Sequence, residues 1–198
     1  TGDNPFKKKE VRQALYQAID IDAIKKKVMR GLSEPAGIIT FPGVNGYTAD
    51  LDKRLPYDVD AAKKLLADAG YPNGFDVELR CPNDRYVNDE AICTAVVGMF
   101  GKIGVNVNLF AQTKSKHFKE LKDNQGDFYM LGWGVPTLDS HYVFHYLYES
   151  GASWNKVNFS NSEVDAAIRV MEGEVDLDKR NAAIANAWKI VKDDISYL

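Results

Sequence analysis

The sequence predicts an α/β fold in which a mixed, mainly parallel sheet is flanked by helices. Residues 75–81 and 105–111 alternate apolar and polar side chains, as half-buried strands do. Residues 128–133 form a continuous apolar run, which is typical of a central strand buried on both faces. Helical periodicity separates these segments. A β-α-β-α-β order implies parallel strands joined by right-handed crossovers.

Three helices are expected before the first strand. Residues 8–19 carry apolar side chains at helical spacing, and Asp20 then supplies the N-cap of a second, short helix that ends at Gly31. Residues 33–57 hold three prolines and three glycines without a sustained period, which predicts a long loop. Asp60 is the expected N-cap of the third helix.

Four more helices are expected from the first strand onward. Their apolar side chains recur at helical spacing in residues 88–103, around Phe118 and Leu121, from the capping-box-like "SEVD" at 162–165, and from Ile184 to Ile195. The last two of these helices close the chain.

Composition and charge exclude several classes of function. The 198 residues are 45% hydrophobic and 27% charged, which is ordinary for a globular protein. A net charge of −3 argues against a nucleic-acid partner, which requires clustered Lys and Arg. No apolar run approaches the ~20 residues of a membrane helix. Cys81 and Cys93 allow one internal bridge and leave the redox compartment open.

The segment "MLGWGVPTLDSHYVFHYLY", residues 130–148, carries the strongest candidate for a site. Trp133 is expected at the C-terminal end of a strand, where ligands bind in open α/β sheets. Gly132 and Gly134 leave space for a backbone or a ligand to approach closely. These features favour a wall that grips a ligand by stacking. The alternative is that Trp133 belongs to the core.

A metal site is the second interpretation of this segment. His141 and His145 are four residues apart, so they share one face of a helix, and Asp139 is close by. The pattern lacks a third strong ligand, and the flanking aromatic residues indicate packing or an aromatic wall. We therefore expect no bound metal and no cofactor.

Catalysis has little support in the sequence. The chain contains no GxSxG, GxGxxG or GxxxxGK[ST] motif. Ser140 stands beside His141, but a catalytic pair requires spatial placement that neighbours in sequence rarely provide. The chain is not expected to be an enzyme.

Five segments carry a resemblance to a known family. They are "NPFKKKEVRQALYQAIDIDAI", "YDVDAAKKLLADAGYPNGF", "GKIGVNVNL", "NFSNSEVDAAI" and "DKRNAAIANAWKIVKDD", in that order. Together they resemble the C-terminal lobe of bacterial extracellular solute-binding proteins of the oligopeptide, dipeptide and nickel class. The resemblance implies a periplasmic-binding-protein-like fold. It also implies that residues 1–198 form a single C-terminal lobe, with the N-terminal lobe and a final C-terminal segment outside this chain.

The resemblance implies solute capture for an ABC importer, with a peptide or peptide-like ligand held between two lobes. The implied partners are the protein's own N-terminal lobe and inner-membrane ABC permease subunits, with no nucleic acid. The implied location is the periplasm, or the cell exterior for a membrane-anchored lipoprotein. Two alternatives remain: a receptor for a metal chelate such as a nickel complex or haem, and, from another class, a fragment of a hydrolytic enzyme.

The resemblance also implies a set of ligand-binding residues. In peptide-binding relatives, an Asp three residues after the Trp of the segment similar to "GWGVPTLD" pairs with the peptide's α-amino group. Trp133 matches, but Pro136 stands at the acidic position, so Asp139 becomes the expected charged contact. "NDRY" (83–86) follows the first strand, and Arg85 could bind a carboxylate bidentately. The expected ligand-binding residues are Trp133, Gly134, Asp139, Arg85, Tyr86 and His141.

Overall fold

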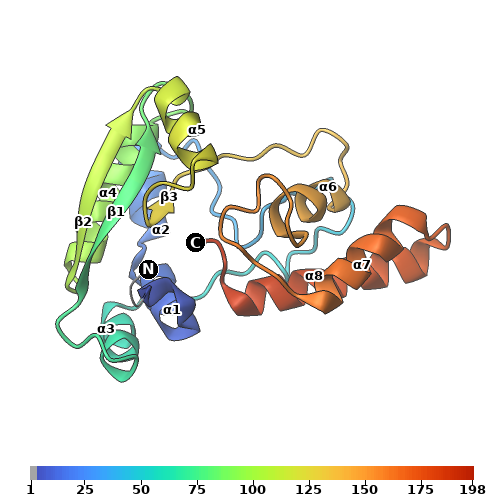
Figure 1. Ribbon diagram of the computed structural model, residues 1–198, viewed down its shortest axis with the longest axis horizontal. Coiled ribbons are helices and arrows are strands. Elements are labelled where there is room, and N and C mark those ends of the chain that lie inside the picture. Colours follow the sequence, from blue (N-terminus) through green and yellow to red (C-terminus); the bar gives the residue numbers. More distant parts are fainter. Residues whose placement is uncertain (1–3) are drawn as a thin grey trace. The chain divides into compact units, whose positions relative to one another are not determined.

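The structure, a computed structural model, describes residues 4–198, and residues 1–3 of the predicted lobe lie outside it. The chain divides into two compact units (Figure 1). Unit 1 comprises residues 4–35, 55–132 and 198 of the described chain, and unit 2 comprises residues 36–54 and 133–197. No helix within residues 4–198 has both the length and the apolar character that crossing a bilayer requires.

A parallel three-stranded sheet forms the centre of unit 1. β1 (Phe75–Pro82) is the middle strand, with β2 (Val105–Gln112) on one side and β3 (Phe128–Tyr129) on the other. β1 and β2 pair over their whole length. The three predicted strands therefore share one sheet, and the predicted α/β class is confirmed.

The prediction for residues 128–133 was wrong in one respect. Among the described residues, β3 is a short edge strand with half-buried side chains, not a central strand buried on both faces. It pairs with β1 through Leu79 and Arg80, and one further hydrogen bond joins the amide of Met130 to the carbonyl of Arg80 at 2.9 Å. A continuous apolar run cannot report how many neighbouring strands it has, so the edge position was not visible in the sequence.

Helices cover this sheet. The helical segments of unit 1 are η1 (Pro5–Lys7), α1 (Lys9–Ala18), α2 (Ile21–Ala23), η2 (Ile24–Val28), α3 (Val59–Asp68), α4 (Asp89–Gly101) and α5 (Lys114–Lys122). α4 packs on β1 and β2, with Phe100 fully buried and Ile92 and Val96 half-buried against the core (Figure 1). α1 and α3 pack against each other.

Side-chain caps set where the helices begin. Asp20 caps α2 as predicted, because its carboxylate accepts the amide of Ala23 at 2.9 Å. The cap of α3 is Asp58 and not Asp60: Asp58 accepts the amide of Ala61 at 2.9 Å, which places Asp60 in the first turn.

A disulfide joins Cys81 at the end of β1 to Cys93 in α4, with the two Cα atoms 6.6 Å apart. Both cysteines are buried. The bridge closes a short loop that contains the turn after β1, so it fixes this turn between a strand and a helix.

Unit 2 is built on helices and one long loop. Its helical segments are α6 (His141–Val143), the π-helical η3 (Phe144–Tyr148), α7 (Ser162–Gly173) and α8 (Leu177–Asp194). α7 and α8 pack against each other (Figure 1). The cap of α7 is Asn161, whose side chain accepts two amides, so Ser162 is the first helical residue and not the cap. The predicted loop at 33–57 contains no regular helix or strand.

Candidate functional site

The short helix formed by α6 and η3, His141–Tyr148, presents three different faces. One face is buried in the core of unit 2 and consists of Val143, Phe144, Leu147 and Tyr148. Tyr142 and Tyr146 are four residues apart and form the second face, and His141 and His145 form the third. Residues at this spacing lie on one side of a helix, so each pair acts as a unit.

Trp133 lies in an aromatic cluster on the tyrosine face. Its ring centroid is 6.0 Å from that of Tyr142, 5.9 Å from that of Tyr146 and 6.1 Å from that of Trp154. The indole is half-buried. Its Nε1–H is covered and makes no hydrogen bond to any described residue. An unpaired buried donor costs about 1–3 kcal/mol.

The two glycines beside Trp133 have different surroundings. A Cβ on Gly132 would lie 2.6 Å from the ring of Tyr86, and the Tyr86 hydroxyl donates to the Gly132 carbonyl at 3.3 Å. The predicted close approach at Gly132 is therefore that of a tyrosine ring. A Cβ on Gly134 would meet no described atom within 4 Å, so packing does not require glycine there.

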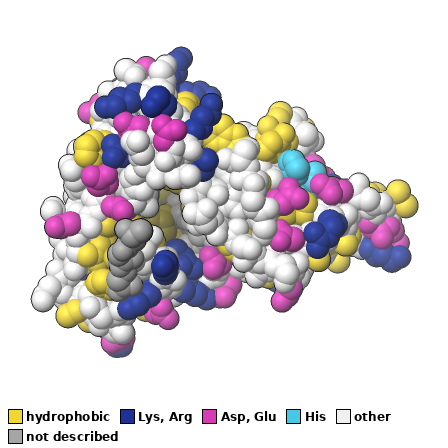
Figure 2. All heavy atoms as spheres, in the orientation of Figure 1, with side chains coloured by type: hydrophobic (Ala, Val, Ile, Leu, Met, Phe, Trp, Pro, Cys, Tyr) yellow, Lys and Arg dark blue, Asp and Glu magenta, His cyan; other side chains and the backbone are white. Residues whose placement is uncertain are grey.

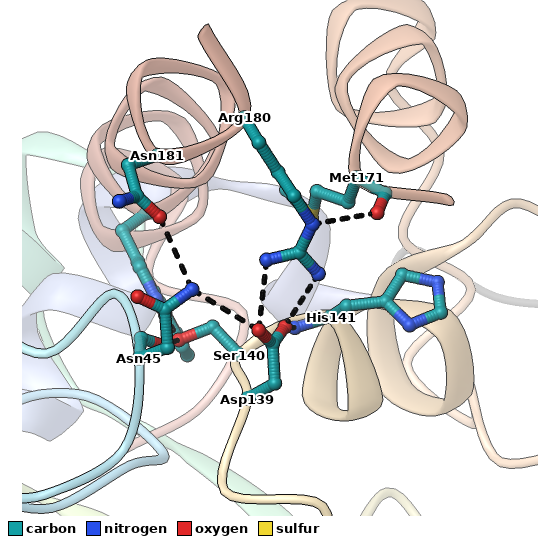
Figure 3. Close-up of polar contacts among 8 residues, drawn as sticks. Asn45, Asp139, Ser140, His141, Met171, Arg180 and Asn181 are labelled. Atoms are coloured by element: carbon teal, nitrogen blue, oxygen red, sulfur yellow. Dashed lines mark hydrogen bonds and ion pairs between the residues drawn. The ribbon is translucent and has the colours of Figure 1, made fainter. Parts of the chain in front are cut away.

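Asp139 is held by donors from three segments of unit 2 (Figure 3). Arg180 donates to both of its carboxylate oxygens, at 2.8 and 2.9 Å. Asn45 donates at 3.0 Å, and the amide of His141 donates at 2.9 Å. Burial alone would raise the pKa of Asp139, but these hydrogen bonds and the Arg180 charge outweigh it and lower the pKa.

The four hydrogen bonds occupy the lone pairs of this carboxylate, which has about four acceptor positions. The ligand contact predicted for Asp139 stays a prediction. The geometry favours a positioning role, in which Asp139 anchors the end of loop 133–140. Arg180 is anchored in turn, because its Nε donates to the carbonyl of Met171 at 2.8 Å.

Ser140 is fully buried beneath this network. Its hydroxyl donates to the carbonyl of Asn45 at 2.6 Å and accepts the indole N–H of Trp188 at 3.1 Å. The hydroxyl therefore joins loop 36–54 to α8.

Arg85 and Tyr86 lie in unit 1, in the turn between β1 and α4. Asp89 fixes this turn by accepting the amides of Arg85 at 2.9 Å and Tyr86 at 3.0 Å. Burial would raise the pKa of Asp89, but the backbone donors outweigh it and lower the pKa. The guanidinium of Arg85 lies 5.0 Å from the centroid of the Tyr86 ring, on an exposed residue.

His141 lies on the histidine face of the helix, next to the tyrosine face: the ring of its neighbour His145 contacts that of Tyr146, with centroids 4.8 Å apart. The His141 ring stacks on that of His145 with centroids 5.6 Å apart. Glu172, near the end of α7, brings a carboxylate oxygen to 3.5 Å from Nε2 of His141. A third candidate ligand, which the sequence pattern lacked, is thus Glu172, 27 residues after His145 in the chain (172 − 145).

The structure groups the predicted ligand-binding residues by unit. Trp133, Gly134, Asp139 and His141 belong to unit 2, and Arg85 and Tyr86 belong to unit 1. The sequence interpretation expected the aromatic residues that flank the histidines to form packing or an aromatic wall, but it did not place Tyr142 and Tyr146 against Trp133, although their four-residue spacing was a usable signal. It also missed Trp154 and Arg180, for which no local pattern exists.

Residues 1–155 match the family described as bacterial extracellular solute-binding proteins, family 5 middle. The chain belongs to this family. Members of family 5 are solute-binding proteins, and the predicted resemblance is thereby confirmed.

Two curated relatives are similar to this family 5 chain in sequence. Heme-binding protein A of Haemophilus influenzae is 29% identical over 202 residues, which cover 98% of this chain and 36% of that protein. The dipeptide-binding protein of Escherichia coli is 31% identical over 159 residues, which cover 79% of this chain and 30% of that protein. The family 5 chain thus spans roughly a third of the length of these relatives.

A solved structure shares the fold. The periplasmic binding protein DppA from Helicobacter pylori, in complex with the peptide STSA, superposes with a TM-score of 0.88 at 22% identity. The match covers 100% of this chain and 38% of DppA. The predicted periplasmic-binding-protein-like architecture is confirmed by this likeness.

Proposed function

We propose that this chain is one lobe of a solute-capture protein for an ABC importer. In this proposal residues 1–198 form a C-terminal lobe that binds a peptide or peptide-like solute together with the protein's own N-terminal lobe. Membership of solute-binding family 5 carries the proposal. The proposed partners are inner-membrane permease subunits, and no catalytic step is involved.

Trp133 is the proposed centre of the solute-binding wall. Tyr142, Tyr146 and Trp154 support its ring from the protein side, at centroid distances of 5.9 to 6.1 Å. The open space beside Gly134 suits a ligand that stacks on the uncovered part of the ring. A planar peptide group meets this requirement.

Arg85 is the proposed charged contact of unit 1. The side chain is exposed and forms no ion pair with a described residue, while Asp89 fixes its backbone. Tyr86 supports the guanidinium from one side. A guanidinium in this setting suits a carboxylate, which it can bind through two parallel hydrogen bonds.

Solute capture by closure follows from the energetics of two lobes. A ligand that contacts both lobes stabilises the closed state over the open state, and this difference drives the hinge. We propose the periplasm, or the cell exterior for an anchored lipoprotein, as the location. The Cys81–Cys93 disulfide supports this, because disulfides persist in oxidising compartments.

A haem or metal-chelate receptor is the second candidate function. The observation in its favour is the 29% identity to a relative named heme-binding protein A, which extends over 98% of this chain. A porphyrin would also stack on Trp133, so the aromatic wall does not separate the two candidates.

Identification of the carried-over ligand tests the proposal. The full-length protein, purified without refolding, is denatured and its released small molecules are identified by mass spectrometry. We expect peptides or peptide-like compounds, and their amount should fall in protein carrying Trp133→Ala. Recovery of haem or a metal chelate would favour the second candidate, and turnover of a supplied peptide would overturn the assignment as a non-enzyme.

A further inference from the structure

Four polar side chains of unit 2 converge on the histidine face of the short helix. His141 and His145 come from α6 and η3, Glu149 follows η3, and Glu172 lies near the end of α7. Nδ1 of His145 lies 2.9 Å from a Glu149 oxygen and 3.9 Å from a Glu172 oxygen. The same Glu172 oxygen lies 3.5 Å from Nε2 of His141. On the surface, histidine side chains lie beside acidic ones (Figure 2).

Two imidazole nitrogens of this cluster face carboxylate oxygens. Nε2 of His141 and Nδ1 of His145 are covered from solvent, and their polar neighbours are a Glu172 oxygen at 3.5 and 3.9 Å and, for His145, a Glu149 oxygen at 2.9 Å. An ion pair here requires protonated imidazoles, whereas neutral imidazoles would present their lone pairs to the carboxylates. A cation between them would satisfy both lone pairs and the carboxylate together.

The spacing of these atoms suits a small coordination sphere. One nitrogen from each of His141 and His145 and one oxygen of Glu172 all lie within 4.8 Å of one another. Tetrahedral coordination with bonds of about 2.0–2.1 Å separates ligand atoms by about 3.3 Å. The distances of 3.5 and 3.9 Å from Glu172 to the two rings exceed this value by less than 1 Å. Small side-chain rotations would therefore bring these atoms to the spacing of metal ligands.

We propose that His141, His145 and Glu172 bind one divalent transition-metal ion, with Zn²⁺ as the best-matched ion. Imidazole nitrogen suits Zn²⁺, Ni²⁺ and Cu²⁺, whereas Ca²⁺ and Mg²⁺ prefer sites made of oxygen atoms. Two histidines and one glutamate supply three ligands. The fourth coordination position is left to a water molecule.

The surroundings of the cluster support a binding role. Asp139 accepts the amide of His141 at 2.9 Å, and Arg180 fixes Asp139, so the backbone that carries the first ligand is anchored (Figure 3). The ion would join the short helix to the end of α7. The site adjoins the proposed solute wall, because the ring of His145 contacts that of Tyr146 with centroids 4.8 Å apart.

Titration with Zn²⁺ tests this proposal. The full-length protein, without a polyhistidine tag and stripped with EDTA, is titrated with Zn²⁺ near neutral pH by isothermal calorimetry. We expect one ion bound per chain, and a higher thermal midpoint with Zn²⁺ present. His145→Gln and Glu172→Gln should each weaken this binding by about 100-fold or more, beyond the effect of losing an orienting group.

Glu163→Gln is the matched control, because Glu163 is an exposed residue in the first turn of the same helix, α7, and lies outside the cluster. This variant should bind Zn²⁺ as the unchanged protein does. Far-UV circular dichroism of each zinc-free variant checks that the fold is intact. The proposal is overturned if the unchanged protein binds no Zn²⁺, or if His145→Gln and Glu172→Gln both retain its affinity.

Discussion

Two tryptophans of unit 2 differ in burial and in hydrogen bonding. Trp188 is 1% exposed and donates its indole N–H to Ser140 at 3.1 Å, as a core residue should. Trp133 is half-buried, and its indole N–H has no partner among the described residues. The same side chain is therefore a structural element in one position and a candidate contact surface in the other.

The first prediction compares these two tryptophans. In the full-length protein, Trp133→Ala should weaken solute binding by about tenfold or more, because stacking on an indole contributes ~0.5–1.5 kcal/mol beyond the area that it buries. Its urea midpoint should change little. Trp188→Ala is the matched control, and should lower the free energy of unfolding by about 3–5 kcal/mol. If Trp133→Ala also lowers the free energy of unfolding by about 3–5 kcal/mol, and the variant that remains folded binds solute normally, Trp133 belongs to the core.

The second prediction concerns Asp139. Asp139→Asn breaks the bidentate pair with the partly buried Arg180, and should lower the free energy of unfolding by about 1.5–3 kcal/mol at neutral pH. Because folding lowers the pKa of Asp139 below its ordinary value of 3.8, this stabilisation is present above that value. It is lost as the pH falls through the folded-state pKa, so the difference between the two proteins should shrink in acid.

Urea unfolding at a series of pH values measures this difference. Asp50→Asn is the control, since the Asp50–Lys53 pair is exposed at 87% and 75% and should contribute little. Equal stability of Asp139→Asn and the unchanged protein at neutral pH would show that the carboxylate is not an anchor. It would return Asp139 to the role of a ligand contact.

At the residue scale, the sequence singled out Trp133 but could not predict the contacts of Asp139. Trp133 stood out because glycines flank it, and the structure gives it aromatic neighbours. Asp139 was expected to contact a ligand because Pro136 occupies the acidic position of the relatives. Its ion-pair partner Arg180 could not be predicted, because it is 41 residues away and no local pattern links the two. A sequence reports which side chains are near in the chain, and a carboxylate's role depends on which donors the fold brings to it.

At the scale of elements, the disulfide between β1 and α4 gives the third prediction. Replacing both Cys81 and Cys93 with Ala should lower the free energy of unfolding by about 3 kcal/mol, because the bridge restricts the unfolded chain. Urea unfolding with and without a reducing agent measures this. The reducing agent should destabilise the unchanged protein and leave the double variant unaffected. An equal response of both proteins would mean that the bridge does not form.

Element types were predictable and element boundaries less so. Apolar periodicity identified the helices and the strands of unit 1, because the pattern of burial imposes it. Helix starts shifted by one or two residues where another side chain is the cap: Asp58 in place of Asp60, and Asn161 in place of Ser162. β3 was expected to reach Trp133 and ends at Tyr129, because its pairing depends on β1 and not on its own composition.

At the scale of the whole molecule, family 5 relatives are much longer than this chain, which spans 36% and 30% of the two described above. The fourth prediction follows from the proposal that the missing part holds the other half of the site. Residues 1–198 expressed alone should bind the solute at least about tenfold more weakly than the full-length protein. The solute loses the same translational and rotational freedom in both cases, but fewer contacts offset that loss in the isolated chain.

Calorimetry with the solute identified by mass spectrometry provides this comparison. Circular dichroism must first establish that the isolated chain folds. Micromolar or tighter binding by the isolated chain would argue against a ligand held between two lobes.

The three faces of the helix at 141–148 restrict how this segment can vary. A substitution changes one face and leaves the other two in place. An insertion or a deletion of one residue would turn every later side chain by about 100° around the helix axis. Tyr146 would then leave Trp133, and His145 would leave Glu172, while a tyrosine, Tyr146 or Tyr148, would take the core position of Leu147. Across natural variants, the length of this segment should therefore be kept more strictly than any single residue within it.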